Sequence, residues 1–94
     1  MSDTREAIES LLVETEREHG AYETSELNGV YDDDWPSWYA RHAVERGVGA
    51  LVGREVSPDE LATFLARAHE DFQRSDLERG RWAGYIAQRM VTEL

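Results

Sequence analysis

The sequence predicts an all-α protein, folded as one compact four-helix bundle with a long loop between the first and second helices. Apolar side chains recur at the i, i+3, i+4, i+7 spacing of amphipathic helices, and no alternating run is long enough for a convincing strand. Serine- and aspartate-led patterns that begin helices recur along the chain. A chain of 94 residues is one domain by length, so residues 1–94 are expected to share a single core.

The charge balance excludes several classes of function. Twenty acidic residues face ten basic ones, all of them arginine, and the net charge is −10. Such a chain repels phosphate backbones, so no nucleic-acid partner is expected. No apolar run is long enough to span a membrane and the N-terminus lacks a signal pattern, so we expect a cytoplasmic protein without a membrane partner. Without cysteine there is no disulfide, zinc–thiolate site or thiol nucleophile.

The first helix is expected to begin after Asp3, which forms a capping-box pattern with Glu6. Its apolar stripe continues at helical spacing to His19, and Gly20 is predicted to end it. Residues 20–34 are then predicted to form a loop that packs across the bundle. The anchors expected for this loop are Tyr22, Leu27, Val30 and Tyr31.

The second helix is predicted from the stretch "YDDDWPSWYARH" at 31–42. Asp34 is the expected N-cap, and Pro36 suits the first turn. The helix is predicted to run to about residue 52, with Gly47 and Gly49 weakening its end. Its inward stripe is predicted to hold Trp35, Trp38, Tyr39, His42, Ala43 and Arg46.

The third and fourth helices are predicted from two similar starts. In "SPDE" at 57–60, Ser57 is a capping residue, with proline at the first helical position and glutamate at the third. The pattern "SDLE" at 75–78 predicts the start of the fourth helix. The segments "WPSWYARHAV" (35–44) and "WAGYIAQRMV" (82–91) share a rhythm that indicates either two similar amphipathic faces or a duplication.

The density of aromatic residues suggests the first functional hypothesis. A core this small cannot easily hide three tryptophans, and exposed apolar patches mark partner surfaces. We therefore predict a small acidic interaction domain that binds itself, as a homodimer, or another protein. The predicted interaction residues are Trp35, Trp38, Tyr39, Trp82 and Tyr85.

The alternative hypothesis is a pocket for a small anionic ligand. His42, Arg46 and Arg89 fall on apolar helix faces, and an arginine there needs a partner. They could converge on an anion, with Trp38 and Tyr39 flanking it. The competing explanation is internal pairing of these arginines with the loop carboxylates. Those carboxylates are Glu23, Asp32 and Asp33.

No catalytic residue, metal or cofactor is predicted. Catalysis needs a base beside a nucleophile, and only His42 is a plausible base. His19, His42 and His69 are the candidate ligands of a zinc site, and Glu16-x-x-His19 has the spacing of a carboxylate-bridged site. A di-metal bundle, however, needs a second such pair and further inward glutamates. Neither pattern is present in the sequence.

Two stretches, "EHGAYE" (18–23) and "YDDDWPSWYARHAVERGVGALVG" (31–53), resemble a set of small uncharacterised bacterial all-α proteins. Those proteins share a histidine-glycine-x-tyrosine-glutamate turn, followed by a helix with an acidic-tryptophan-tryptophan-tyrosine-alanine pattern. No activity is known for them, so the resemblance assigns no site residue. It implies that the loop and the second helix form one unit.

Overall fold

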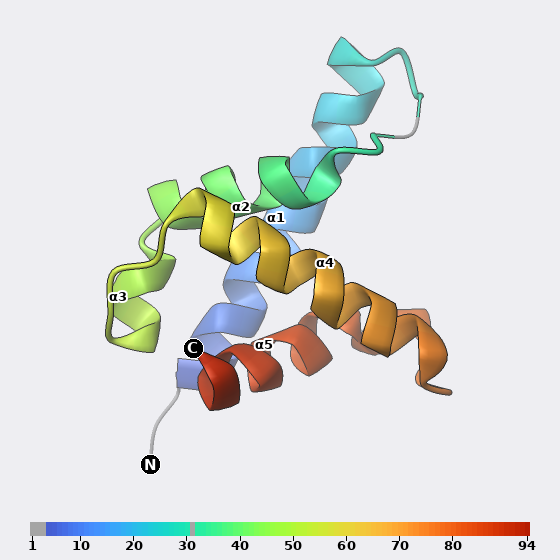
Figure 1. Cartoon of the computed structure of the whole chain (residues 1–94). Coiled ribbons are helices and arrows are strands. Elements are labelled where there is room, and N and C mark those ends of the chain that lie inside the picture. Colours follow the sequence, from blue (N-terminus) through green and yellow to red (C-terminus); the bar gives the residue numbers. More distant parts are fainter. Residues whose placement is uncertain (1–3, 31) are drawn as a thin grey trace.

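The computed structural model describes residues 4–30 and 32–94, and this part of the chain consists of helices and the segments that connect them, without a strand (Figure 1). The all-α prediction is confirmed, but five α-helices are present in the described residues instead of four. They are α1 (Thr4–Glu26), α2 (Trp35–Glu45), α3 (Val48–Val52), α4 (Pro58–Arg74) and α5 (Trp82–Glu93), and a 3-10 turn, η1 (Arg79–Arg81), precedes α5. None of these helices is both long and apolar enough to cross a membrane.

The helices pack as two crossed pairs. α1 packs most extensively on α5, and α2 on α4. In Figure 1, α1 lies behind α4, while α2 and α5 lie on opposite sides of them and run in the same direction. One core joins all five helices, because each contributes at least one buried apolar side chain. Its largest fully buried apolar members are Ile8, Leu12, Val48, Leu61, Leu65, Ile86 and Met90.

Helix α1 is longer than predicted. It continues through Gly20 to Glu26, so the loop shrinks from 20–34 to 27–34. A glycine inside a helix costs only about 1 kcal/mol, which the packing of the added turns can offset. The true stop is at Asn28 and Gly29, which have positive φ, and Gly29 N–H donates to the carbonyl of Glu23 at 2.8 Å. The predicted cap Asp3 and loop anchor Tyr31 lie outside the described residues.

The predicted second helix is divided in two at Gly47. This residue has φ 91°, a left-handed conformation that glycine adopts without steric cost, and it separates α2 from α3. At the other end of α2, Asp34 occupies the N-cap position as predicted but makes no side-chain cap. Its N–H instead donates to Oδ1 of Asp32 at 3.0 Å.

The two serine-led starts have different outcomes. Ser57 caps α4 as predicted, since its hydroxyl accepts the N–H of Glu60 at 3.1 Å. The prediction for "SDLE" is wrong because Ser75 ends α4 instead of beginning the next helix. Its hydroxyl donates to the carbonyl of Phe72 at 2.6 Å and accepts the N–H of Leu77 at 3.3 Å. A short hydroxyl side chain can bond backbone groups at either end of a helix, so the local pattern does not decide between them.

Candidate functional site

A cavity of about 640 Å³ lies between the C-terminal halves of α1 and α4 and the first residues of α2 and α5. It combines aromatic walls with titratable groups. The described lining residues are Glu16, His19, Gly20 and Glu23 from α1, Trp35 and Tyr39 from α2, His69, Phe72 and Gln73 from α4, Ser75 and Leu77 from the following connection, and Trp82 from α5.

The aromatic wall is a chain of edge-to-face contacts. The ring of Trp35 meets Tyr39 at 5.0 Å, His69 at 5.0 Å and Trp82 at 6.0 Å between centroids. Tyr39 meets Trp82 at 5.7 Å, almost perpendicularly. The indole Nε1–H of the buried Trp82 donates to Nδ1 of His69 at 3.1 Å. Edge-to-face geometry of this kind stabilises aromatic pairs beyond the area that they bury.

A buried histidine that is hydrogen-bonded to an aspartate forms another side of the cavity. His19 Nε2 lies 2.9 Å from Asp32 Oδ2, and the two side chains are only 7% and 14% exposed. The hydrogen bond from His19, with a smaller contribution from the N–H of Asp34, lowers the pKa of Asp32. The N–H of Asp32 also donates to Glu23 Oε2 at 3.0 Å. The 27–34 loop is thereby tied to α1, and the His19 imidazole is held at the cavity.

Asp32→Asn should destabilise the protein near neutral pH by about 1–2 kcal/mol, because a hydrogen bond to a charged group is lost. The pKa of Asp32 is lowered on folding, so its contribution is present above the unfolded value of 3.8 and is lost as the pH falls through the folded value. The stability difference between wild type and variant should therefore narrow in acid. Urea unfolding across a pH series measures it. A stability difference that stays constant down to the lowest pH would contradict the lowered pKa of Asp32.

The five predicted interaction residues are divided between two places. Trp35, Tyr39 and Trp82 line the cavity. Trp38 instead stacks on His42 at 5.2 Å, and Tyr85 packs on Phe72 at 5.3 Å. Trp82 is buried and the other four are half-buried. Binding to a partner stays a prediction; these side chains form a cavity wall and the margin of the core.

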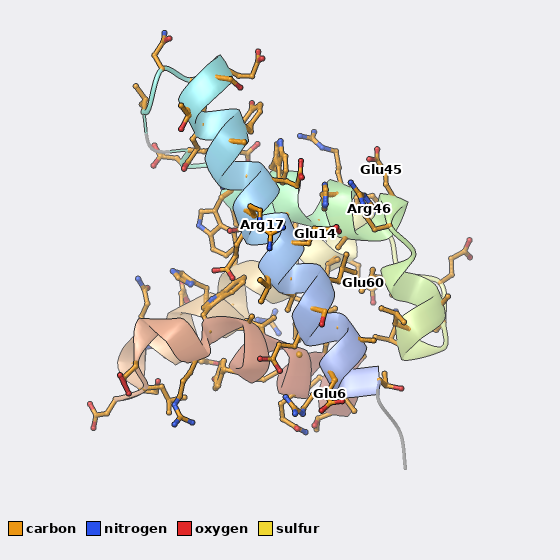
Figure 2. All side chains as sticks on the ribbon, turned by 180° about the vertical axis from the view of Figure 1, so that it is seen from behind. Glu6, Glu14, Arg17, Glu45, Arg46 and Glu60 are labelled. Carbon is orange, nitrogen blue, oxygen red and sulfur yellow. The ribbon has the colours of Figure 1, made fainter. Side chains whose placement is uncertain are left out.

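The predicted anion-binding residues do not meet. Arg46 is half exposed and reaches Glu14 of α1 at 3.3 Å (Figure 2). Arg89 donates to Asp71 and to Glu93, each at 2.6 Å. Neither arginine lines the cavity, and neither does His42. The internal-pairing alternative is therefore closer to the structure, although the partners are helical carboxylates instead of the predicted loop carboxylates.

The three histidines have separate surroundings. His19 bonds Asp32, His69 accepts from Trp82, and His42 stacks on Trp38. His42 Nε2 is buried and has no hydrogen-bond partner within the described part of the chain. Across residues 4–30 and 32–94, no group of three or more histidine, aspartate or glutamate side chains is placed to hold a metal ion.

Several cavity residues were missed by the sequence analysis. Glu16, Gly20 and Glu23 recur at i, i+4 and i+7 on α1, with His19 beside them. This spacing would have placed them on one face if the helix had been expected to pass Gly20. Comparisons with known proteins add no assignment, because no family model, no curated protein and no solved structure matches this chain.

Proposed function

We propose that the protein is a small ligand-binding domain whose ligand occupies the cavity between α1, α2, α4 and α5. The supporting observation is the cavity itself, whose volume of about 640 Å³ falls in the range of metabolite sites. Its walls are aromatic, and a few polar groups are held at fixed positions. The apolar body of the ligand would lie against Trp35, Tyr39 and Trp82.

The polar part of the ligand is proposed to be a hydrogen-bond-donating cation such as an amine. Glu23 lines the cavity, and among the described residues its carboxylate accepts the backbone N–H of Asp32 through Oε2. A carboxylate has about four lone-pair sites, so this one bond leaves most of them for a ligand. Indole and phenol faces attract cations, and the net charge of −10 raises their local concentration. This ligand class replaces the anion expected from Arg46 and Arg89.

Three probes with one ring and different head groups test this function: benzylamine, benzyl alcohol and benzoate. Calorimetric titration should give the order benzylamine, benzyl alcohol, benzoate from tightest to weakest. An ammonium group gains a charge-assisted hydrogen bond to a carboxylate, whereas a second carboxylate is repelled. If wild type binds none of the probes, or binds benzoate most tightly, the proposed ligand class is wrong.

A blocking variant shows whether binding occurs in this cavity. Gly20 lines the cavity, and a Cβ built there has no neighbour within 4 Å. Gly20→Leu should therefore add a large side chain to the cavity lining while favouring the helix, and should weaken benzylamine binding by about tenfold or more. Ala21→Leu, at the next exposed position, is the matched control because Ala21 does not line the cavity. Equal affinity in the two variants would place the binding site elsewhere.

A further inference from the structure

The two halves of the chain carry the same residue types at the same places in the fold. α1 has the pattern His-x-x-Tyr-Glu at 19–23, and α4 has His-x-x-Phe-Gln at 69–73. α2 begins with Trp-x-x-Trp-x-Ala at 35–40, and α5 begins with Trp-x-x-Tyr-x-Ala at 82–87. Both halves are therefore a helix that ends after a histidine–aromatic pair, a connection, and a helix that begins with tryptophan.

The packing of the helices is also the same when the two halves of the chain are exchanged. α1 packs mainly on α5 and α4 mainly on α2, so exchanging the two halves reproduces the pairing. In Figure 1, α1 rises behind the molecule and α4 descends in front, while α2 and α5 run the same way. A half-turn about an axis along α2 and α5 relates these directions.

One pair of equivalent aromatic contacts is similar in the two halves. The ring of Tyr22 packs on Trp38 at 5.5 Å, tilted by 34°, and its counterpart Phe72 packs on Tyr85 at 5.3 Å, tilted by 53°. The alanines that end the two tryptophan patterns, at 40 and 87, are both fully buried. Sequence and contacts thus point to the same approximate twofold relation.

The cavity contains both members of three equivalent pairs: His19 with His69, Glu23 with Gln73, and Trp35 with Trp82. We infer that the cavity consists of two equivalent half-sites, one from each copy of a duplicated helix–loop–helix unit, and that Glu23 against Gln73 decides which half-site takes the cationic group of the ligand. The inference rests on the proposed function, since it concerns the orientation of a ligand in the same cavity.

The two half-sites differ in chemistry at several positions. Glu16 and Tyr39 line the cavity, whereas their counterparts at 66 and 86 do not. His19 bonds Asp32, whereas His69 accepts from Trp82.

Positions 23 and 73 are the pair at which a carboxylate faces an amide of the same shape. Glu23 and Gln73 each follow a cavity histidine by one helical turn, on the same helix face. Their side chains have the same shape, but only the carboxylate offers a charge-assisted hydrogen bond to an ammonium group. If the half-sites are equivalent, a carboxylate at position 73 should serve as well as one at position 23.

A charge swap in the full-length protein tests this. Glu23→Gln should weaken benzylamine binding by about tenfold, and Gln73→Glu should strengthen it. The double variant Glu23→Gln/Gln73→Glu should recover wild-type affinity to within about threefold. Benzyl alcohol, measured in parallel, should change little, and glutamine at position 23 keeps an oxygen to accept the N–H of Asp32, so the fold is preserved.

The outcomes separate the two proposals. A double variant that binds benzylamine as weakly as Glu23→Gln alone would overturn the equivalence of the half-sites while leaving the cavity as a binding site. Loss of benzyl alcohol binding along with benzylamine would also overturn it, because the substitution would then act on the cavity shape. A wild type without affinity for benzylamine would overturn this inference together with the proposed function.

Discussion

Replacing Trp82 by alanine is expected to lower the free energy of unfolding by about 3–5 kcal/mol. The side chain is only 6% exposed and sits where the walls of the cavity meet. It contacts the rings of Trp35 and Tyr39, and its indole N–H bonds His69. The substitution removes these contacts together and leaves a void beside the core, and a 94-residue domain has only about 5–15 kcal/mol of stability to lose.

Urea denaturation followed by circular dichroism measures this loss without depending on tryptophan fluorescence. Trp82→Phe keeps most of the ring contact and loses the hydrogen bond, so it should cost less, about 1–2 kcal/mol. Val91→Ala on the same helix is the matched surface control; Val91 is 44% exposed, and its truncation should change stability by about 0.5 kcal/mol or less. If Trp82→Ala costs no more than Val91→Ala, the wall is not packed as described.

The second large effect is expected at Arg89. Arg89→Met should lower the free energy of unfolding by about 1–3 kcal/mol, since charge-assisted hydrogen bonds are lost. The side chain is 21% exposed and donates to Glu93, Asp71 and the hydroxyl of Tyr85. The pKa of Arg89 is raised above its ordinary value, first by Glu93 and then by Asp71, so the guanidinium stays charged. Its bond to Asp71 lowers the pKa of that carboxyl.

Arg46→Met is the control for this prediction. Arg46 is 48% exposed, and its ion pair with Glu14 is long, at 3.3 Å. Exposed ion pairs of this kind contribute about 0–1 kcal/mol. Methionine keeps a flexible apolar stem at both positions, so the comparison isolates the charge. Equal losses in the two variants, by thermal or urea unfolding, would contradict the difference in burial and bonding seen between the two arginines.

The sequence predicts a helix well where the signal is local and has one meaning. Ser57 followed by proline and glutamate begins α4 as expected, because only a helix start uses those residues together. Prediction of a helix end fails where the same residue type occurs in two different helix positions. Gly20 was expected to end α1 and is helical, and Ser75 was expected to begin a helix and ends one.

Prediction of the candidate site from the sequence is limited in a related way. A helical stripe identifies the face that a residue occupies, but not the helix that covers this face. Trp35, Tyr39 and Trp82 could be singled out from the sequence because large aromatic side chains at helical spacing belong near the core. The partner Asp71 of Arg89 could not be identified from the sequence, because Asp71 belongs to α4 and tertiary packing brings it near Arg89.

The histidine-glycine-x-tyrosine-glutamate segment, expected to be a turn, is helical in the structure.

Self-association stays a prediction. The large exposed apolar side chains among the described residues are single residues on separate segments: Val13, Val30, Leu77 and Val91. Light scattering at several protein concentrations measures it directly, and a mass that does not change with concentration would exclude it.

Binding of a small amine in the cavity is tested most directly by the indole N–H signals of the three tryptophans. Trp35 and Trp82 line the cavity. Trp38 does not line it, although its ring lies 4.9 Å from that of His19, a lining residue. In a titration with benzylamine followed by two-dimensional NMR, with assignments from single Trp→Phe variants, the signals of Trp35 and Trp82 should shift with one common saturation curve and by more than that of Trp38. Three unmoved signals at high benzylamine concentration, or a shift confined to Trp38, would contradict binding in the cavity.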